Sequence, residues 1–218
     1  MPRVLLLIPT STYRTEAFLS AAAKMEVDVT VASEQPNALA RLNPAALLTL
    51  SFAEPALAAQ QAVEFSSDYP VDAVVAVDDQ VTYVGATICL ALGLRHNTVA
   101  AVQAAGDKYQ MRQLFQIAGL PTPQFQQFEF DTDLRTICRD INFPCVVKPL
   151  QFSGSKGVIR ANNQSELVDA IDRLRQIVES EAESWPENST SQRSGRQSQE
   201  SSTFLVEEFV AGPEIALE

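Results

Sequence analysis

Continuous apolar strands alternate with helices along the first hundred residues, and this pattern restricts the fold more than any other feature of the chain. Predominantly apolar runs of strand length occur at residues 4–8, 27–32, 47–50 and 71–77. Helical patterns lie between or after them, at residues 16–25, 55–67 and 81–92. Strands buried on both faces have continuous apolar sequences, and helical crossovers between them make a parallel sheet. We therefore predict a doubly wound α/β domain over residues 1–105.

The turn after the first predicted strand excludes one common use of such a sheet. In open parallel sheets, ligands bind beyond the carboxyl ends of the strands. A dinucleotide site requires Gly-x-Gly-x-x-Gly at the first turn, whereas residues 9–13 read Pro-Thr-Ser-Thr-Tyr without a glycine. The hydroxyl groups of this turn could bind a small substrate, but we favour capping of the next helix. Asp78 and Asp79 follow the fourth strand, and we predict capping there too.

Composition restricts the partners and the compartment. The chain has a formal net charge of −11 and no basic cluster, which argues against a nucleic acid or an anionic membrane surface as its main partner. A nucleotide needs only a few local cations, so nucleotide binding stays compatible with this charge. The three cysteines lack metal-ligand spacing, and their odd number favours a reducing cytoplasm. Because no apolar segment approaches the length of a membrane span, we expect a cytoplasmic protein.

A second unit is predicted for residues 106–218. Asp107 is a suitable N-cap for a helix over residues 108–118, and Gly119 is a suitable residue to end it. Asn163 and Glu166 form a capping-box pattern at the start of a later helix. Strands are predicted at residues 124–130, 145–149, 158–161 and 203–210. This unit therefore mixes short strands with helices.

Residues 144–158, Pro-Cys-Val-Val-Lys-Pro-Leu-Gln-Phe-Ser-Gly-Ser-Lys-Gly-Val, carry the strongest functional signal. Lys148 lies at the end of a short buried strand, and a glycine loop follows at once. A fixed cation beside backbone N–H groups that converge on anionic oxygens can hold a polyphosphate. The alternative is a simple hairpin with a solvated lysine, which is less favourable because an unpaired ammonium within an apolar run is costly. The loop does not match the Gly-x-x-x-x-Gly-Lys-[Ser/Thr] of a P-loop.

Composition changes abruptly at residues 179–202, where Ser, Gln, Glu, Asn and Arg dominate. Such a segment cannot bury enough apolar surface to fold alone, so we predict a disordered insertion. Trp185 is its one large apolar residue. A further strand is predicted at residues 214–218, and because the chain stops within that pattern we expect it to be part of a larger domain.

Four motifs in this order and spacing resemble the ATP-grasp superfamily. They are Asp107-Lys108 with Met111-Arg112 (followed by Ala-Gly-Leu-Pro-Thr-Pro), then Phe-Pro-Cys-Val-Val-Lys-Pro, then Gly-Ser-Lys-Gly-Val, then Val-Glu-Glu-Phe-Val-Ala-Gly-Pro-Glu. The resemblance covers about residues 107–218, and it is nearest to the large chain of carbamoyl-phosphate synthase, biotin carboxylase and the amino-acid ligases. It implies an α+β small lobe (with the start of a large lobe) after a pre-ATP-grasp, Rossmann-like domain.

The resemblance also implies which residues hold the phosphates of ATP. Lys108 and Lys148 match the two lysines that contact ATP in this family. The mobile loop that closes over the phosphates is matched by Ser153, Gly154, Ser155 and Gly157.

On the nucleoside side, the resemblance assigns Glu207, Glu208 and Val210 to the segment between the lobes, where backbone groups and an acid hold the adenine. Glu214 matches an acid commonly found at the ribose hydroxyls. No catalytic residue and no metal ligand is assigned within this chain, because the family's magnesium-binding residues are expected beyond residue 218.

The implied function is the ATP-binding portion of an ATP-dependent ligase that joins a small carboxylate to an amine through an acyl phosphate. ATP and Mg²⁺ are the implied cofactors, and a homo-oligomer is compatible with the family. The chain alone is expected to be inactive. The alternative is a non-catalytic, ATP-grasp-like nucleotide-binding or regulatory module.

Overall fold

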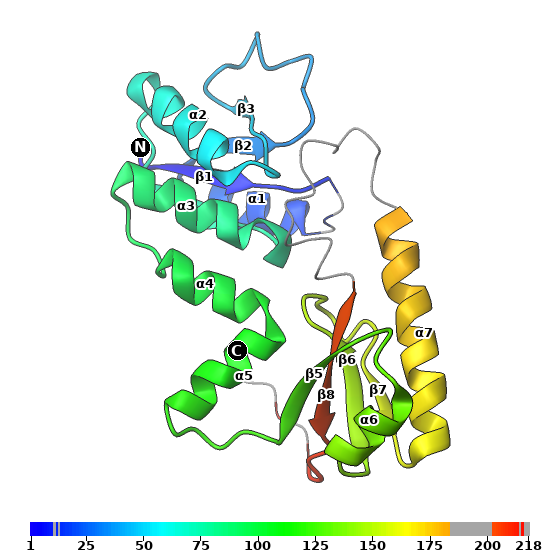
Figure 1. The fold of residues 1–218 in the computed structure, drawn as a ribbon. Helices are drawn as coiled ribbons and strands as arrows, with labels where there is room; N and C mark the ends of the chain where they lie inside the picture. The colour runs from blue at the N-terminus through cyan, green and yellow to red at the C-terminus, as the bar shows by residue number, and fades with distance from the viewer. Residues whose placement is uncertain (11, 13, 184–201, 214, 216–218) are drawn as a thin grey trace. The chain divides into compact units, whose positions relative to one another are not determined.

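The computed structural model describes residues 1–10, 12, 14–183, 202–213 and 215 (Figure 1). The chain divides into two compact units, residues 1–103 and residues 104–218. None of the described helices combines the length and the hydrophobicity needed to cross a membrane. All three cysteine thiols are free.

The first unit contains a parallel sheet, as the apolar runs predict. Its strands are β1 (Arg3–Leu7), β2 (Asp28–Ser33), β3 (Leu47–Thr49) and β4 (Ala73–Ala76). They lie in the order β3-β2-β1-β4, and every neighbouring pair is parallel. Because β1 is central, helical crossovers on both faces are needed to reach its two neighbours.

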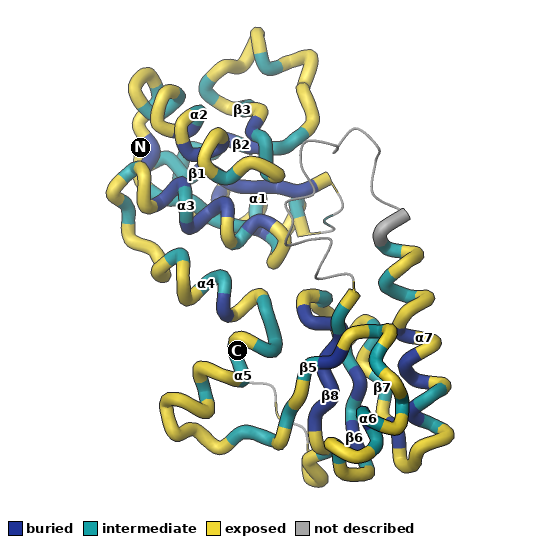
Figure 2. Tube along the Cα trace, in the orientation of Figure 1, coloured by how far each residue is buried: buried dark blue, intermediate teal, exposed yellow. Residues whose placement is uncertain are grey.

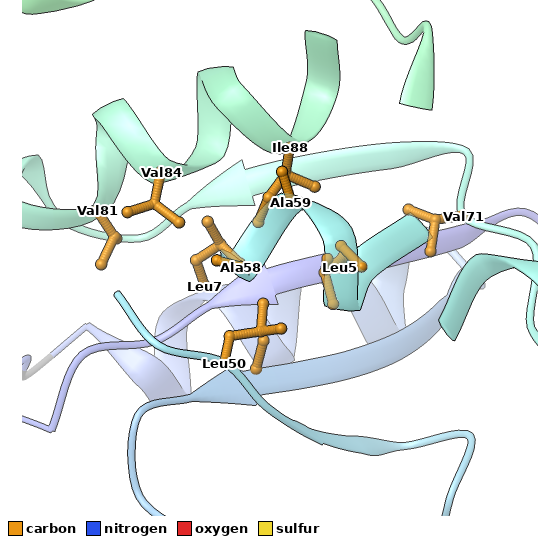
Figure 3. Close-up of a cluster of buried hydrophobic side chains, with 11 residues drawn as sticks. Leu5, Leu7, Leu50, Ala58, Ala59, Val71, Val81, Val84 and Ile88 are labelled. Atoms are coloured by element: carbon orange, nitrogen blue, oxygen red, sulfur yellow. The ribbon is translucent and has the colours of Figure 1, made fainter. Parts of the chain in front are cut away.

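Helices cover both faces of this sheet. They are α1 (Thr15–Lys24), α2 (Pro55–Asp68), the short 3₁₀ helix η1 (Asp79–Val81) and α3 (Thr82–Leu92); α4 (Val99–Gly106) follows at the division between the units. On one face, Leu5 and Leu7 pack against α2 and α3 (Figure 3). On the other, Leu6 packs with Phe18 of α1. Successive residues of β1 thus point into two apolar layers, which confirms the doubly wound α/β class.

The turn after β1 differs from the prediction. The N-cap position of α1 is Arg14, whose side chain makes no capping hydrogen bond. The backbone N–H and the hydroxyl of Thr10 instead donate to Glu34 Oε1, at 3.2 and 2.9 Å. Thr12 Oγ1 accepts from the backbone N–H of Arg14 at 3.3 Å, one residue before the helix begins. The predicted cap is therefore wrong for Thr10 and Thr12, and Ser11 lies outside the described residues. Asp78 does cap η1.

The second unit contains an antiparallel sheet. Its strands are β5 (Phe125–Glu129), β6 (Cys145–Pro149), β7 (Ile159–Ala161) and β8 (Thr203–Glu208). The order is β5-β8-β6-β7, and all neighbouring pairs are antiparallel. The last of the described strands, β8, therefore lies in the interior of the sheet, between β5 and β6.

Three described helices belong to this unit, and a side chain caps the start of each; Asp107 and Asn163 are the caps that the sequence predicts. The helices are α5 (Lys108–Ile117), α6 (Leu134–Asp140) and α7 (Gln164–Glu183). Asp107 accepts from Gln110 N–H, Asp133 from Arg135 N–H, and Asn163 from Glu166 N–H. Buried residues of α6 and α7 pack on one face of the sheet, and Figure 2 shows a buried stripe along α7.

Helix α7 continues to Glu183, so the first five residues of the predicted disordered insertion, 179–183, are helical instead. Adding one residue to an existing helix requires much less ordering than starting a new one, and Val178 packs against the core just before this stretch. Residues 184–201, including Trp185, lie outside the described residues. So does most of the strand predicted at 214–218, and β8 ends at Glu208 rather than at residue 210.

Candidate functional site

Strand register places Lys148 and Glu207 on the same face of the second sheet. Val146 lies directly opposite Glu207, and Lys148 lies two residues further along β6. Since side chains alternate between faces, Lys148 is the diagonal neighbour of Glu207, within reach of two long side chains. The opposite face carries the apolar core, with Val147 and Val206.

Glu207 is a buried carboxylate shared by two cations. Its side chain is 5 % exposed, and its Oε2 accepts a hydrogen bond from Lys148 Nζ. Arg112 Nε donates to Oε1 at 2.7 Å, and the guanidinium also reaches Oε2 at 3.4 Å. Burial alone raises the pKa of this carboxyl, but the hydrogen bonds and charges of Arg112 and Lys148 outweigh it, so the pKa of Glu207 lies below its usual range. Glu207 is therefore an anion at neutral pH.

Arg112 is the site residue that the sequence prediction did not assign. It follows Lys108 by four residues on α5, so both side chains lie on one face of the helix. That spacing within the Asp-Lys-x-x-Met-Arg motif is the signal that could have identified it. Arg112 and Lys148 thus place two cations on one carboxylate, and Lys108 lies one helical turn from Arg112.

Lys108 fixes the start of α5 to the segment that leaves β6. Its Nζ donates to the carbonyl oxygens of Leu150 and Phe152, at 3.3 and 2.6 Å, and its backbone N–H donates to the Leu150 oxygen at 3.0 Å. Phe152 directly precedes the glycine loop. The structure therefore brings Lys108 to the entrance of that loop.

The loop itself is a run of tight turns between β6 and β7. Its predicted ligand residues, which the structure places together there, are Ser153, Gly154, Ser155 and Gly157. Lys156 N–H donates to the Ser153 oxygen, and Val158 N–H to the Ser155 oxygen. Gly154, Ser155 and Gly157 have positive φ angles of 63°, 58° and 74°. Two of these three left-handed positions are glycines, which adopt that conformation without steric cost.

Gly157 also has no room for a side chain. A Cβ there would lie 2.8 Å from Leu174 Cδ1 and 3.2 Å from Pro149 Cδ. By contrast, a Cβ at Gly154 would meet nothing within 4 Å. The loop is thus anchored at Gly157 against α7 and β6, and it is open at Gly154.

Of the residues predicted on the nucleoside side, Glu207 is paired with Lys148, whereas Glu208 and Val210 do not gather there. Glu208 is exposed, and strand alternation points it to the face opposite Glu207. Val210 is 69 % exposed. Glu214 lies outside the described residues. Between them, the Phe209 ring is covered by the Arg160 guanidinium, 3.9 Å from the ring centroid.

Magnesium ligands are not found in the part of the chain that the structure describes, where no group of three or more His, Cys, Asp or Glu side chains gathers. The carboxylate of Glu207 has both oxygens engaged by cations, so it does not suit a metal ion. We assign no described residue to Mg²⁺.

Two family profiles match the two units of the chain. The ATP-grasp N-terminal domain matches residues 19–96, and the ATP-grasp domain matches residues 141–218. With the doubly wound sheet, the antiparallel sheet and the lysine-bearing strand, these matches show that the chain belongs to the ATP-grasp superfamily.

Individual relatives agree with this assignment. The chain is 29 % identical over 93 residues to D-alanine–D-alanine ligase of Neisseria meningitidis serogroup C, covering 43 % of this chain and 31 % of the ligase. Its fold is similar to that of L-amino acid ligase from Bacillus licheniformis, with a TM-score of 0.64 at 17 % identity over 98 % of this chain and 45 % of that one.

A third similar structure is the biotin carboxylase domain of Hydrogenobacter thermophilus 2-oxoglutarate carboxylase, solved with MgADP, ADP and bicarbonate. Its TM-score is 0.57 at 16 % identity, over 95 % of this chain and 44 % of that chain. The chain thus spans about a third of the length of the curated relative and about half of the solved structures.

Proposed function

We propose that the chain is the ATP-binding portion of an ATP-dependent ligase that joins a carboxylate to an amine. The observation that carries this proposal is the pairing of Arg112 and Lys148 with one buried carboxylate, while Lys108 holds the segment that enters the glycine loop. A site with more cations than anions favours a polyphosphate. The D-alanine–D-alanine ligase and the L-amino acid ligase among its relatives support the reaction class.

In the proposed complex, Lys148 and Lys108 offset the charge of the phosphates, and N–H groups of Ser153, Gly154, Ser155 and Gly157 close over them. Closure of such a loop excludes water and holds the terminal phosphate in position for attack. Glu207, Glu208, Val210 and Glu214 remain the proposed contacts to the nucleoside.

The proposed chemistry has two steps. A substrate carboxylate oxygen attacks the terminal phosphorus of ATP, and the bond from this phosphorus to the bridging oxygen breaks. ADP departs, and the product is an acyl phosphate. The amine nitrogen then attacks the acyl carbon, inorganic phosphate departs, and the amine proton passes to solvent. Mg²⁺ would spread the phosphate charge.

Nucleotide binding is tested by titrating ATP, with Mg²⁺ present, into the wild type and Lys148→Met. We expect the variant to lose about tenfold or more in affinity, which corresponds to ~1.4 kcal/mol of lost phosphate interaction. The matched control is Lys24→Met, because Lys24 is an exposed lysine in the first unit. Equal affinity of Lys148→Met and the control would contradict the phosphate assignment.

The ligase and the non-catalytic module share this ATP site, so turnover separates them. ADP formation is measured in the protein that contains this sequence, with mixtures of amino acids offered as acid and amine. ADP formation that requires these substrates and disappears in Lys148→Met supports the ligase. ATP binding without ADP formation supports the module.

A further inference from the structure

Nucleotide binding by Lys148 would take one of its two partners away from the buried carboxylate of Glu207. In the structure, both of its oxygens are engaged, and Lys148 is one of the two partners. Lys148 is also one of the two lysines proposed to hold the phosphates. When its ammonium turns to a nucleotide, Glu207 loses that partner while its side chain stays 5 % exposed.

A buried carboxylate without a partner is strongly unfavourable, because desolvation is no longer offset by an opposite charge. If Lys148 were the only cation beside Glu207, the carboxylate would therefore compete directly with the phosphate for it. The strength of nucleotide binding would then fall by the cost of stranding this anion.

Arg112 is placed to remove that cost. Its guanidinium contacts both oxygens of Glu207, at 2.7 and 3.4 Å, so the carboxylate stays paired without Lys148. A planar guanidinium suits such two-point contact better than an ammonium does. It is also held on α5, whose first turn is fixed by the Asp107 cap and by the Lys108 contacts.

We propose that Arg112 is a positioning residue that keeps Glu207 paired and so releases Lys148 to bind the phosphates of a nucleoside triphosphate. This inference rests on the proposed ATP site and adds how its lysine becomes available. Arg112 acts through Glu207 and Lys148 rather than by touching the nucleotide.

The test compares the affinities for ATP and adenosine, because their ratio isolates the phosphate contribution. Removal of Arg112 in Arg112→Met leaves Glu207 to retain Lys148, so the ratio is expected to fall about tenfold, a change of ~1.4 kcal/mol. Adding Glu207→Gln to that variant removes the competing charge, and the ratio is expected to recover most of the loss. Arg112→Lys keeps one charge and should fall less.

The control is Arg173→Met, since Arg173 is exposed on α7 of the same unit. Thermal unfolding of each variant verifies that it is folded. If Arg112→Met does not fold, the Arg112→Lys protein and its Glu207→Gln double variant are compared in the same way. If Arg112 had a merely structural role, its removal would weaken the binding of ATP and of adenosine in parallel. Adding Glu207→Gln would then not restore the affinity for ATP.

Two failures are distinguishable. If the wild type does not bind ATP, or if Lys148→Met binds it equally well, the proposed function is wrong and this inference fails with it. If Lys148→Met loses the phosphate contribution while Arg112→Met keeps the wild-type ratio, only the role of Arg112 is wrong.

Discussion

The carboxylate of Glu207 places a charge among buried residues that are mostly apolar. Glu207 is one of the few polar residues among the buried positions of the described chain, and it lies in β8 next to Val206 and Leu205. A buried carboxylate is favourable in the folded state only while its cationic partners, here Arg112 and Lys148, remain in contact with it. Its protonation therefore links the site to the stability of the whole unit.

Removing Arg112 is expected to reduce the contribution of the Glu207 carboxylate to the free energy of unfolding. The lowered pKa of Glu207 stabilises the folded state above the unfolded pKa of a glutamate, about 4.3, and that contribution disappears as pH falls through the folded pKa. Arg112→Met should therefore be about 1–3 kcal/mol less stable than wild type at pH 7. The difference should narrow below about pH 4. Urea unfolding of both proteins between about pH 3 and pH 8 measures this difference in the free energy of unfolding. A difference that stays constant with pH would contradict the link between Glu207 ionisation and stability.

The two loop glycines should respond differently to the same substitution. At Gly157, an added methyl group would collide with Leu174 and Pro149 and would also hold a φ of 74°. We expect Gly157→Ala to lose about 2–4 kcal/mol of stability, from overpacking and from the left-handed backbone. Gly154→Ala has only the backbone penalty, about 1–2 kcal/mol. Equal unfolding midpoints of the two variants would show that the close approach at Gly157 relaxes easily.

At the scale of elements, α5 is the piece that joins fold to site. Its hydrogen-bonded cap determines where the helix begins, and Lys108 and Arg112 lie within its first two turns. Fraying of this end would therefore displace two cations at once.

Two caps of the same chemistry allow stability and binding to be separated. Asp107→Ala and Asp133→Ala remove the N-caps of α5 and α6, and each should lower stability by about 1 kcal/mol. Only Asp107→Ala should also weaken ATP binding, because α6 carries none of the cations of the candidate site. Calorimetric titration beside thermal unfolding measures both effects. A similar affinity loss in Asp133→Ala would mean that the effect on binding is nonspecific.

Sequence patterns predicted the elements of this chain where a local chemical rule decides the outcome. Asp107 and Asn163 are found at helix starts because capping depends on residues close in the sequence. The role of Thr10 was missed because its partner, Glu34, is distant in sequence. Arg112 was missed for the same reason, since its partner lies 95 residues away.

At the scale of the whole molecule, all the described site residues belong to one unit. Lys108, Arg112, Lys148 and Glu207 lie within residues 104–218, whereas the first unit has its own core. Linkage predicts that a ligand stabilises the structure that it binds.

Hydrogen exchange with ATP should reveal this division. At 100 times the dissociation constant, ATP adds about 2.7 kcal/mol to the stability of the folded state that binds it. We expect slower exchange in β6 and β8 than without ATP, and little change in β1 and β2. Lys148→Met serves as the control that removes the effect. Equal protection of both sheets would show that the units unfold together.

The order of strands in the second sheet was beyond sequence prediction. The lengths of β5, β6 and β7 are nearly those that their apolar patterns suggest, but nothing in those patterns says which strand joins which. Pairing is decided by long-range contacts, such as Phe128 with Phe204, whose ring centroids lie 6.1 Å apart. Such contacts form only once the remote segment is present.

The interior position of β8 has a consequence for synthesis of the protein on the ribosome. Residues 203–208 emerge after β5, β6 and β7, so the edges of β5 and β6 that pair with β8 stay unpaired until then. Glu207 arrives in the same segment, so Lys148 meets its counterion only when the last strand is inserted. The proposed ATP site and the second sheet are then completed by the same late event, so the proposed function implies that a nascent chain binds ATP only after this sheet has closed.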